Sequence, residues 1–188
     1  MKNLGTSAAS KLLFRVAVAE DALELAALHT AVADNLTNLH GRGPWSSRAS
    51  EKGALRAIRH SRVVVATERS AIIATFCLTT KKPWAIDTSY FTECALPLYL
   101  LGMAVTPSRQ RQGVGRKCLG EAQHMAAAWP ADAIRLDAYD AGAGGGPFYE
   151  RCGFTERGHI CYRKAPLTYY EMLIKRNSAS TGGRSARR

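Results

Sequence analysis

The chain has 188 residues and a formal net charge of +11, with 46% hydrophobic and 22% charged residues. This size and composition fit one globular domain with a sizeable core, and no apolar stretch approaches the roughly 20 residues of a membrane-spanning helix. The five cysteines include no Cys-x-x-Cys pair and the five histidines are scattered, so neither a disulfide framework nor a metal site is indicated. Residues 1–10 lack the apolar run of a signal peptide, and we expect a cytoplasmic protein.

Three segments are expected along the chain: a flexible start over 1–10, a single domain over 11–174 and a disordered tail over 175–188. The tail holds five basic residues and no acid. Its Ser, Gly and Arg content leaves no apolar surface to bury. Such a charge attracts nucleic acid or another acidic partner, but no aromatic residues are interleaved, so a solvated tail is favoured over nucleic-acid binding.

Hydrophobic periodicity predicts a mixed α/β domain. The N-terminal half is expected to contain a strand at 12–18, a helix from Glu20 or Asp21, a loop at 38–47 and a helix at 49–59. Two β-branched runs, 62–67 and 72–78, are typical of a hairpin. An irregular segment at 81–96 then precedes a nearly continuous apolar strand at 98–105, as expected in the middle of a sheet.

The C-terminal half continues the alternation of strands and helices. It is expected to hold a helix from Val114 to near Trp129, a strand at 133–138, a short helix at 147–152, and strands at 160–163 and 167–174. Pro147 suits the first position of the short helix and Gly153 its C-terminal stop. The order β-α-α-β-β-β-α-β-α-β-β describes a mixed sheet flanked by helices.

The segment Thr106-Pro107-Ser108-Arg109-Gln110-Arg111-Gln112-Gly113-Val114-Gly115-Arg116-Lys117 carries the clearest functional signal. It leads from the apolar strand directly into an amphipathic helix. A helix N-terminus is electropositive and prefers acidic neighbours, yet four basic residues gather here: Arg109, Arg111, Arg116 and Lys117. An anion, best a phosphate, resting on the exposed backbone amides explains this arrangement.

Two well-known phosphate loops fail on this segment. Five residues after Gly113, a Walker loop requires a second glycine and a dinucleotide fingerprint requires a third small residue. Cys118 stands at that position, so neither pattern is met. The remaining pattern, Gln/Arg-x-x-Gly-x-Gly, is met by Gln110, Gly113 and Gly115. It resembles the acetyl-coenzyme A loop of the GCN5-related N-acetyltransferases (GNAT family). A glycine-rich turn with solvated arginines is the structural alternative.

A second motif follows about 35 residues beyond the loop: Phe148-Tyr149-Glu150-Arg151-Cys152-Gly153-Phe154. It is similar to the Phe-Tyr-x-x-x-Gly-Phe segment of the same family, and the two motifs occur in the family's order, the loop following the fourth predicted strand. The resemblance covers residues 12–174. It implies the α/β GNAT fold: a mixed, mostly antiparallel sheet of six to seven strands with about four helices, splayed between strands four and five.

The resemblance also implies acetyl-CoA as cosubstrate and no metal. Glycines allow backbone to approach the pyrophosphate, and the pantetheine arm would pair with the edge of the fourth strand. The implied coenzyme residues are Met103, Ala104, Val105, Gln110, Arg111, Gln112, Gly113, Val114, Gly115 and Arg116. Many relatives carry an asparagine six residues before the phenylalanine. Here Gly142 stands at that position, which predicts a more mobile loop and leaves the coenzyme contact there open.

The activity that the resemblance implies is transfer of acetyl to a primary amine. In the family, the tyrosine of the second motif often protonates the departing thiolate, so Tyr149 is the expected general acid; a packed aromatic residue is the structural alternative. Glu93 and Asp87, just before the fourth strand, are candidate bases, and Trp84 and Asp87 are candidate acceptor contacts. Ordinary surface or packing roles are the alternatives for all three residues.

The acceptor is expected to be a small amine, because the acceptor-side segments 34–60 and 81–97 are short and contain several aromatic residues. A non-catalytic alternative is an acyl-CoA-binding or interaction module whose basic tail contacts nucleic acid or an acidic partner. Retention of Tyr149 and of the whole coenzyme loop favours catalysis. Many relatives dimerise, but no feature of the sequence specifies an interface, so a homodimer stays open.

Overall fold

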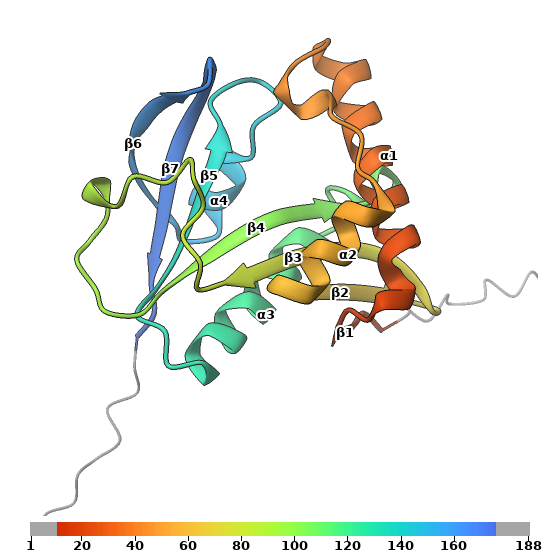
Figure 1. Cartoon of the computed structure of the whole chain (residues 1–188), viewed down its shortest axis with the longest axis horizontal. Coiled ribbons are helices and arrows are strands. Elements are labelled where there is room, and N and C mark those ends of the chain that lie inside the picture. The colour runs from red at the N-terminus through yellow and green to blue at the C-terminus, as the bar shows by residue number, and fades with distance from the viewer. Residues whose placement is uncertain (1–10, 176–188) are drawn as a thin grey trace, which may run out of the picture.

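A seven-stranded sheet in the order β1-β2-β3-β4-β5-β7-β6 runs through the computed structural model, which describes residues 11–175 (Figure 1). The strands are β1 (Leu13–Val16), β2 (Arg62–Glu68), β3 (Ala71–Thr79), β4 (Pro97–Val105), β5 (Ala133–Tyr139), β6 (Thr155–Tyr162) and β7 (Ala165–Leu173). Neighbouring strands are antiparallel except β4 and β5, which are parallel. The predicted mixed, mostly antiparallel sheet is confirmed.

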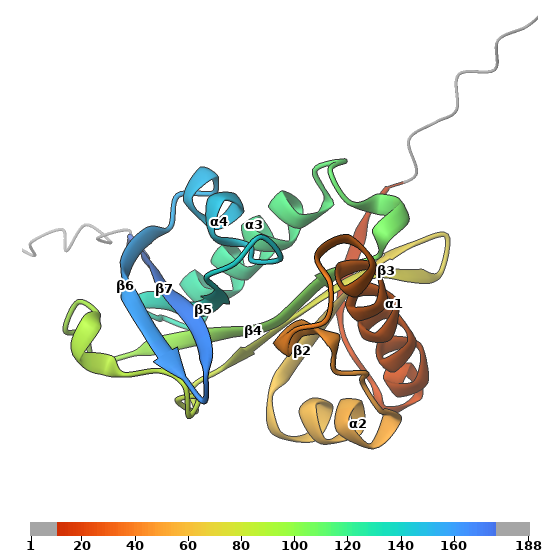
Figure 2. The same cartoon turned by 90° about the horizontal axis from the view of Figure 1, so that it is seen from above.

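Four α-helices cover the two faces of the sheet within the described residues. α1 (Ala22–His40) and α2 (Glu51–His60) lie on one face, and α3 (Val114–Ala128) and α4 (Gly146–Arg151) lie on the other (Figure 2). This number and placement of helices agree with the prediction. No helix between residues 11 and 175 is both long and apolar enough to span a bilayer.

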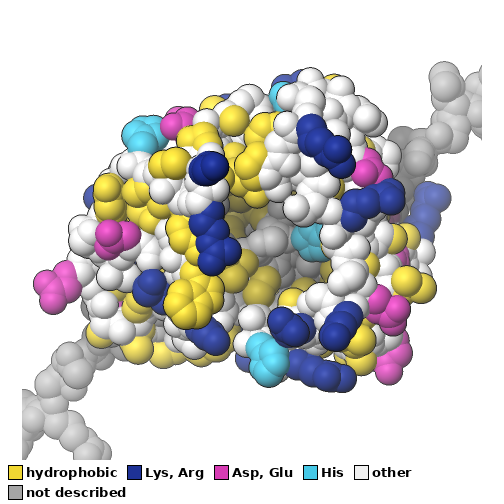
Figure 3. Space-filling model, turned by 45° about the horizontal axis from the view of Figure 1, so that its top comes forward, with side chains coloured by type: hydrophobic (Ala, Val, Ile, Leu, Met, Phe, Trp, Pro, Cys, Tyr) yellow, Lys and Arg dark blue, Asp and Glu magenta, His cyan; other side chains and the backbone are white. Residues whose placement is uncertain are grey.

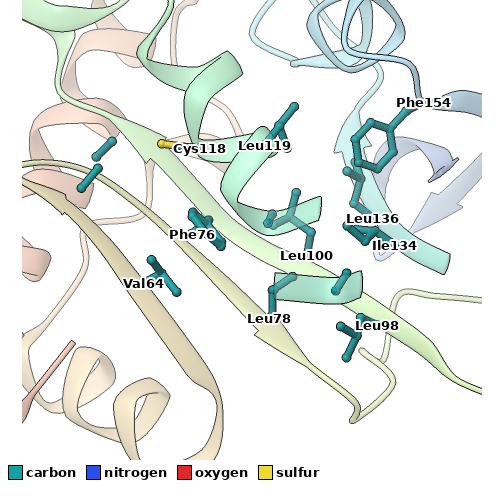
Figure 4. Packing of buried hydrophobic residues seen from close by; sticks show 14 of the residues in the cluster. Val64, Phe76, Leu78, Leu98, Leu100, Cys118, Leu119, Ile134, Leu136 and Phe154 are labelled. Atoms are coloured by element: carbon teal, nitrogen blue, oxygen red, sulfur yellow. The ribbon is translucent and has the colours of Figure 1, made fainter. Parts of the chain in front are cut away.

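The sheet buries both faces, and β2 illustrates the consequence for the sequence. Val63 and Val65 pack in the cluster with Leu25 and Leu28 of α1, whereas Val64 packs in the cluster under α3. Because each face meets a helix, the strand is a continuous apolar run without alternation. In Figure 4, Cys118 and Leu119 of α3 lie over Phe76 and Leu100, residues of β3 and β4 in this second cluster.

β4 and β5 separate soon after they meet. Their pairing is limited to Pro97–Tyr99 against Ala133–Arg135, after which β4 continues along β3 and β5 along β7. A bulge marks the separation, because Gly102 and Met103 of β4 together oppose one residue of β3, and Gly102 has a φ of 55°. A bulge bends the strand that carries it. The predicted splay between the fourth and fifth strands is confirmed.

Two predicted boundaries are wrong. α1 runs to His40 rather than stopping before Asn38, and it ends at Gly41, whose φ of 77° lies in the left-handed region. β6 begins at Thr155 rather than Ile160; its first residues are polar because the strand forms the exposed edge of the sheet, so no apolar pattern marks them. Residues 1–10 and 176–188, with the predicted flexible start and nearly all of the predicted tail, lie outside the described residues.

Candidate active site

A cavity of about 1000 Å³ opens between the separated ends of β4 and β5. α1 contributes one wall, the loop before α3 a second, and the segment from Gly142 through α4 a third. Figure 3 shows this face of the molecule hollowed, with lysine and arginine side chains on the rim and acidic side chains mainly at the periphery. Within the described part of the chain, the lining contains Arg111, Arg116 and Arg151 but a single acid, Asp137. The cavity therefore suits an anionic ligand at its arginine end.

The loop at the entrance to α3 exposes backbone amides. Gly113 is the N-cap of α3 with a φ of 80°, and no side chain caps the helix. The first amides of a helix have no partner one turn earlier, so they point outward as free donors. Gly115 is needed for space: a methyl group there would lie 3.1 Å from Cζ of Phe148. The two motifs of the sequence thus touch each other.

Three side chains of this loop hold the loop itself in place. Gln110 Nε2 donates to the carbonyl of Val105 at 2.9 Å, and Gln112 Nε2 donates to the carbonyl of Ser108 at 2.9 Å. Arg109 donates to Gln112 Oε1 at 3.0 Å and forms an ion pair with Glu68. The loop is therefore stiffened from within, and Arg111 and Arg116 are the cationic side chains of the loop that line the cavity.

Tyr149 is positioned by the short helix α4, which has Pro147 in its first turn. Its ring packs against Phe148 and Phe154, with centroids 5.3 and 5.7 Å away. Its hydroxyl points at Sδ of Met103 on β4, at 4.0 Å. Burial, together with the charge of Asp137, raises the pKa of Tyr149. The hydroxyl therefore keeps its proton at neutral pH and is available as a donor inside the cavity.

Asp137 lies on β5 just beyond the last residue that pairs with β4. Ile134, Leu136 and Ala138 belong to the core under α3, so the alternation of the strand places Asp137 and Tyr139 on the α1 side. Burial raises the pKa of the Asp137 carboxyl. The sequence interpretation missed this residue, although a carboxylate inside an apolar strand was a signal that could have found it.

α1 and the segment after it close the opposite wall. His29 lies beside the β4 bulge, its Cε1 3.8 Å from where a methyl group on Gly102 would be. Burial lowers the pKa of His29, so its imidazole is neutral. Trp45 packs edge-on against Tyr139, with ring centroids 5.8 Å apart. Neither His29 nor Tyr139 was predicted to line the site.

The glycine-rich segment around Gly142 packs against neighbouring residues. The imidazole of His40 approaches Gly142, its Nδ1 3.3 Å from where a methyl group would be, so an asparagine side chain there would meet His40. Gly144 packs against the carbonyl of Tyr139, and Gly145 and Gly146 against tyrosine side chains. The run is closely packed, and its mobility stays a prediction.

The sequence matches a known protein family. A family model described as acetyltransferase (GNAT) domain matches residues 59–156, more than half of the chain. The chain belongs to the GNAT acetyltransferase family. It is therefore an acyltransferase, and its resemblance to that family, inferred from the two motifs, is confirmed.

Solved structures of GNAT proteins share the fold. An N-acetyltransferase from Staphylococcus aureus Mu50 has 15% identity and a TM-score of 0.65, with 88% of this chain and 100% of that chain covered. YncA from Salmonella typhimurium, solved with its cofactor acetyl-CoA, has 16% identity and a TM-score of 0.63 over 92% and 99%. PaiA N-acetyltransferase from Thermoplasma acidophilum, in complex with coenzyme A, has 15% identity and a TM-score of 0.65 over 86% and 99%. No curated protein matches this chain by sequence.

Most of the predicted coenzyme residues of this GNAT domain come together around the cavity. Eight of them line it: Met103, Ala104, Val105, Gln110, Arg111, Gly113, Gly115 and Arg116. Gln112 and Val114 do not, because the Gln112 side chain braces the loop and Val114 packs in the core. Their assignment to the coenzyme would rest on backbone groups alone.

The structure does not bring the predicted acceptor-side residues to the cavity. Glu93 is exposed and precedes β4, so it lies at the other end of that strand from Val105. Trp84 is 89% exposed. Asp87 accepts a hydrogen bond from the Ser89 amide at 3.0 Å. None of the three lines the cavity. Ile86 and Phe91 of their segment instead pack with Tyr99 of β4 and Tyr169 of β7.

A buried ion pair explains where that segment goes. Arg135 of β5 donates through Nε to Glu171 Oε1 of β7 at 2.9 Å and through Nη2 to the carbonyl of Thr92. Glu171 also accepts from the Thr92 amide at 3.2 Å and pairs with Arg157 at 2.7 Å. The Thr92 part of the segment is thus anchored away from the cavity. Residues 11–175 contain no group of three or more His, Cys, Asp and Glu side chains placed to hold a metal ion.

Proposed function

We propose that this GNAT acyltransferase transfers acetyl from acetyl-CoA to the primary amine of a small molecule. Acetyl-CoA is a substrate of this reaction rather than a resident cofactor. Membership of the family supports the acetyl donor, and two proteins of the same fold, YncA and PaiA, were solved with acetyl-CoA and coenzyme A. The observation that carries the proposal is the position of Tyr149, whose hydroxyl faces the free edge of β4 within the cavity.

The coenzyme end of the cavity is assigned to the loop before α3. The open amides of the first turn, at the electropositive end of the helix, are suited to the pyrophosphate. Arg111 and Arg116 add positive charge on the same side of the cavity. The edge of β4 from Met103 to Val105 lacks a strand partner on the β5 side, which suits an extended pantetheine arm.

Tyr149 is assigned the role of general acid. When the neutral amine attacks the thioester carbon, the carbon–sulfur bond breaks and leaves a thiolate. A protonated hydroxyl next to that sulfur stabilises the leaving group by giving it a proton. The raised pKa of Tyr149 ensures that the hydroxyl carries this proton at neutral pH.

The narrow acceptor side supports a small molecule over a polypeptide. The Trp45–Tyr139 ring contact and the approach of His40 to Gly142 join α1 and its following segment to the β5 side of the cavity. A peptide that binds by adding a strand to a sheet needs an open strand edge. A small amine needs only the remaining opening.

This function is tested by measuring free thiol and acetylated amine together over a panel of small primary amines. We expect both products to form at equal rates and only with amine present. If coenzyme A binds but no amine of the panel yields an acetylated product, transfer to small amines is contradicted. If acetyl-CoA itself does not bind, the donor assignment fails as well.

A further inference from the structure

A second cavity, of about 410 Å³, adjoins the first. The two share Pro44, Asp137 and Tyr139. The second cavity is also lined by Ala85, Tyr162, Arg163, Lys164, Ala165 and Leu167, from the segment before β4, the β6–β7 turn and β7. Among residues 11–175, Asp137 is the one acid that lines either cavity, and it lies at their junction.

Asp137 and the proposed general acid, Tyr149, line the same cavity. Burial raises the pKa of Tyr149, of Tyr139 and of Tyr169, and the negative charge of Asp137 adds to the rise in each. The carboxylate that affects these three tyrosines lies where the coenzyme cavity meets the second cavity. An amine entering from the second cavity meets Asp137 before it reaches the Tyr149 side.

We propose that Asp137 binds the ammonium group of the acceptor and takes its proton, and that the second cavity holds an apolar substituent that carries no further positive charge. This assignment rests on the proposed acetyl transfer and names its acceptor class: primary monoamines with an apolar chain or ring.

The lining of the second cavity supports that class. Pro44, Ala85, Tyr162 and Leu167 offer apolar surface, and the Arg163 guanidinium lies 5.3 Å from the centroid of the Tyr162 ring. Arg163 and Lys164 of the β6–β7 turn also line this cavity and carry two positive charges. A second ammonium group on the acceptor would approach these two charges. At a separation of a few ångströms in a partly solvated site, the repulsion would weaken binding by up to about tenfold. Diamines and polyamines are therefore poor acceptors.

The protons of the reaction then balance. The ammonium group gives one proton to the Asp137 carboxylate, and the neutral nitrogen forms a bond to the thioester carbon. The carbon–sulfur bond breaks with its electron pair on sulfur, which takes the Tyr149 proton. The nitrogen loses its second proton through water to the tyrosinate, and Asp137 releases its proton to solvent. The net products are an amide, a thiol and one proton.

The two residues also support each other electrostatically. The charge of Asp137 raises the pKa of Tyr149. When Asp137 has accepted the proton of the acceptor, that charge is gone and the Tyr149 hydroxyl becomes a stronger acid. Transfer of the ammonium proton to Asp137 thus precedes and favours transfer of the Tyr149 proton to the thiolate.

Two amines of equal length test the acceptor class. Pentylamine and cadaverine differ by one ammonium group, and we expect a kcat/KM for pentylamine roughly tenfold higher. Lys164→Glu should move the ratio toward cadaverine by a similar factor. A wild-type preference for cadaverine, or a ratio that Lys164→Glu leaves unchanged, would overturn the class.

Two further amines test Asp137 as proton acceptor. Ethylamine is protonated at neutral pH, whereas trifluoroethylamine is mostly neutral and needs no base. Asp137→Asn should lower kcat/KM for ethylamine roughly 100-fold and affect trifluoroethylamine far less, with unchanged affinity for coenzyme A. Equal loss with both amines would contradict the assignment.

The control is Asp140→Asn, because Asp140 follows the same strand but pairs with His159 outside both cavities. It should leave both rates unchanged. Transfer by the wild-type protein to none of these amines would count against the proposed function itself. Transfer that is indifferent to Asp137 would count only against the inference.

Discussion

The hydroxyl of Tyr149 lies 4.0 Å from the sulfur of Met103, although the two residues are 46 positions apart in the chain. The contact brings α4 against the edge of β4 at the point where β5 has turned away. The proposed acid is therefore placed by the splay of the sheet. Whether Tyr149 acts as an acid or only packs can be measured from the rate of a variant without the hydroxyl.

Tyr149→Phe removes the proton donor but keeps the ring contacts with Phe148 and Phe154. We expect kcat to fall roughly 100-fold, because general acid catalysis contributes about that factor or more. The affinity for coenzyme A and the melting temperature should stay close to wild type. Steady-state kinetics and calorimetry check this, with Tyr90→Phe, at a half-exposed ring outside the cavity, as control. A kcat within twofold of wild type would leave Tyr149 a packing residue.

Gly113→Asp tests the assignment of the loop. An aspartate here would put a negative charge beside the proposed pyrophosphate and would strain a backbone whose φ is 80°. We expect coenzyme A affinity to fall at least roughly tenfold. Gly120→Asp is the matched control, because Gly120 is exposed on the same helix and has open space around it. Equal affinities for the two variants, measured by isothermal titration, would reject the loop as phosphate site.

Gly142→Asn restores the residue that many relatives carry but meets His40. We expect this variant to lower kcat/KM, because the imidazole must move from the wall of the cavity. His40→Ala in the same chain should recover part of the loss, giving a coupling of about 0.5–3 kcal/mol between the two positions. A double-mutant cycle measures this coupling. Additive effects would show that the two side chains do not compete for space.

Glu171→Gln tests the anchor of the segment before β4. The substitution leaves Arg135, which is 3% exposed, without its charged partner. Breaking a buried ion pair at one side costs roughly 3–5 kcal/mol, so denaturant unfolding should show a loss of that size. Glu156→Gln, at an exposed acid of the neighbouring strand, should change stability by less than about 0.5 kcal/mol.

The same residue predicts how stability depends on pH. Burial opposes its charge, yet hydrogen bonds from Thr92 and Arg135 and the charge of Arg157 hold the pKa of Glu171 below its usual 4.5. Because the folded pKa is the lower one, this stabilisation is complete above pH 4.5 and is lost as the pH falls through the folded pKa. Acid titration of the unfolding free energy should give a shallower decline for Glu171→Gln. Parallel curves would contradict this contribution.

The parts of the site that sequence reasoning found are those encoded locally. Gln110, Gly113 and Gly115 form one short pattern, and Phe148 and Tyr149 another, so each could be recognised without knowledge of the fold. Their contact, through Gly115 and Phe148, follows from the family order of the elements. The apolar runs also predicted the strands that precede the splay and the hairpin formed by two of them.

The parts that were missed depend on pairings between distant residues. Asp137 faces the cavity because of the register of β5 and the point at which β4 leaves it, and neither is visible in the sequence. Glu93 was placed near the site because it precedes β4. The Arg135–Glu171 pair, which holds Thr92 of that segment beside the first residues of β5, joins residues 36 positions apart.

The most direct test of the central claim is single-turnover transfer from labelled acetyl-CoA to pentylamine, with the acetylated amine followed by mass spectrometry in wild type and Tyr149→Phe. We predict one acetyl group transferred per thiol released by the wild type, and a rate roughly 100-fold lower for the variant with coenzyme binding intact. Binding of acetyl-CoA without any acetylated amine from the wild type, or equal rates for the two proteins, would contradict the account.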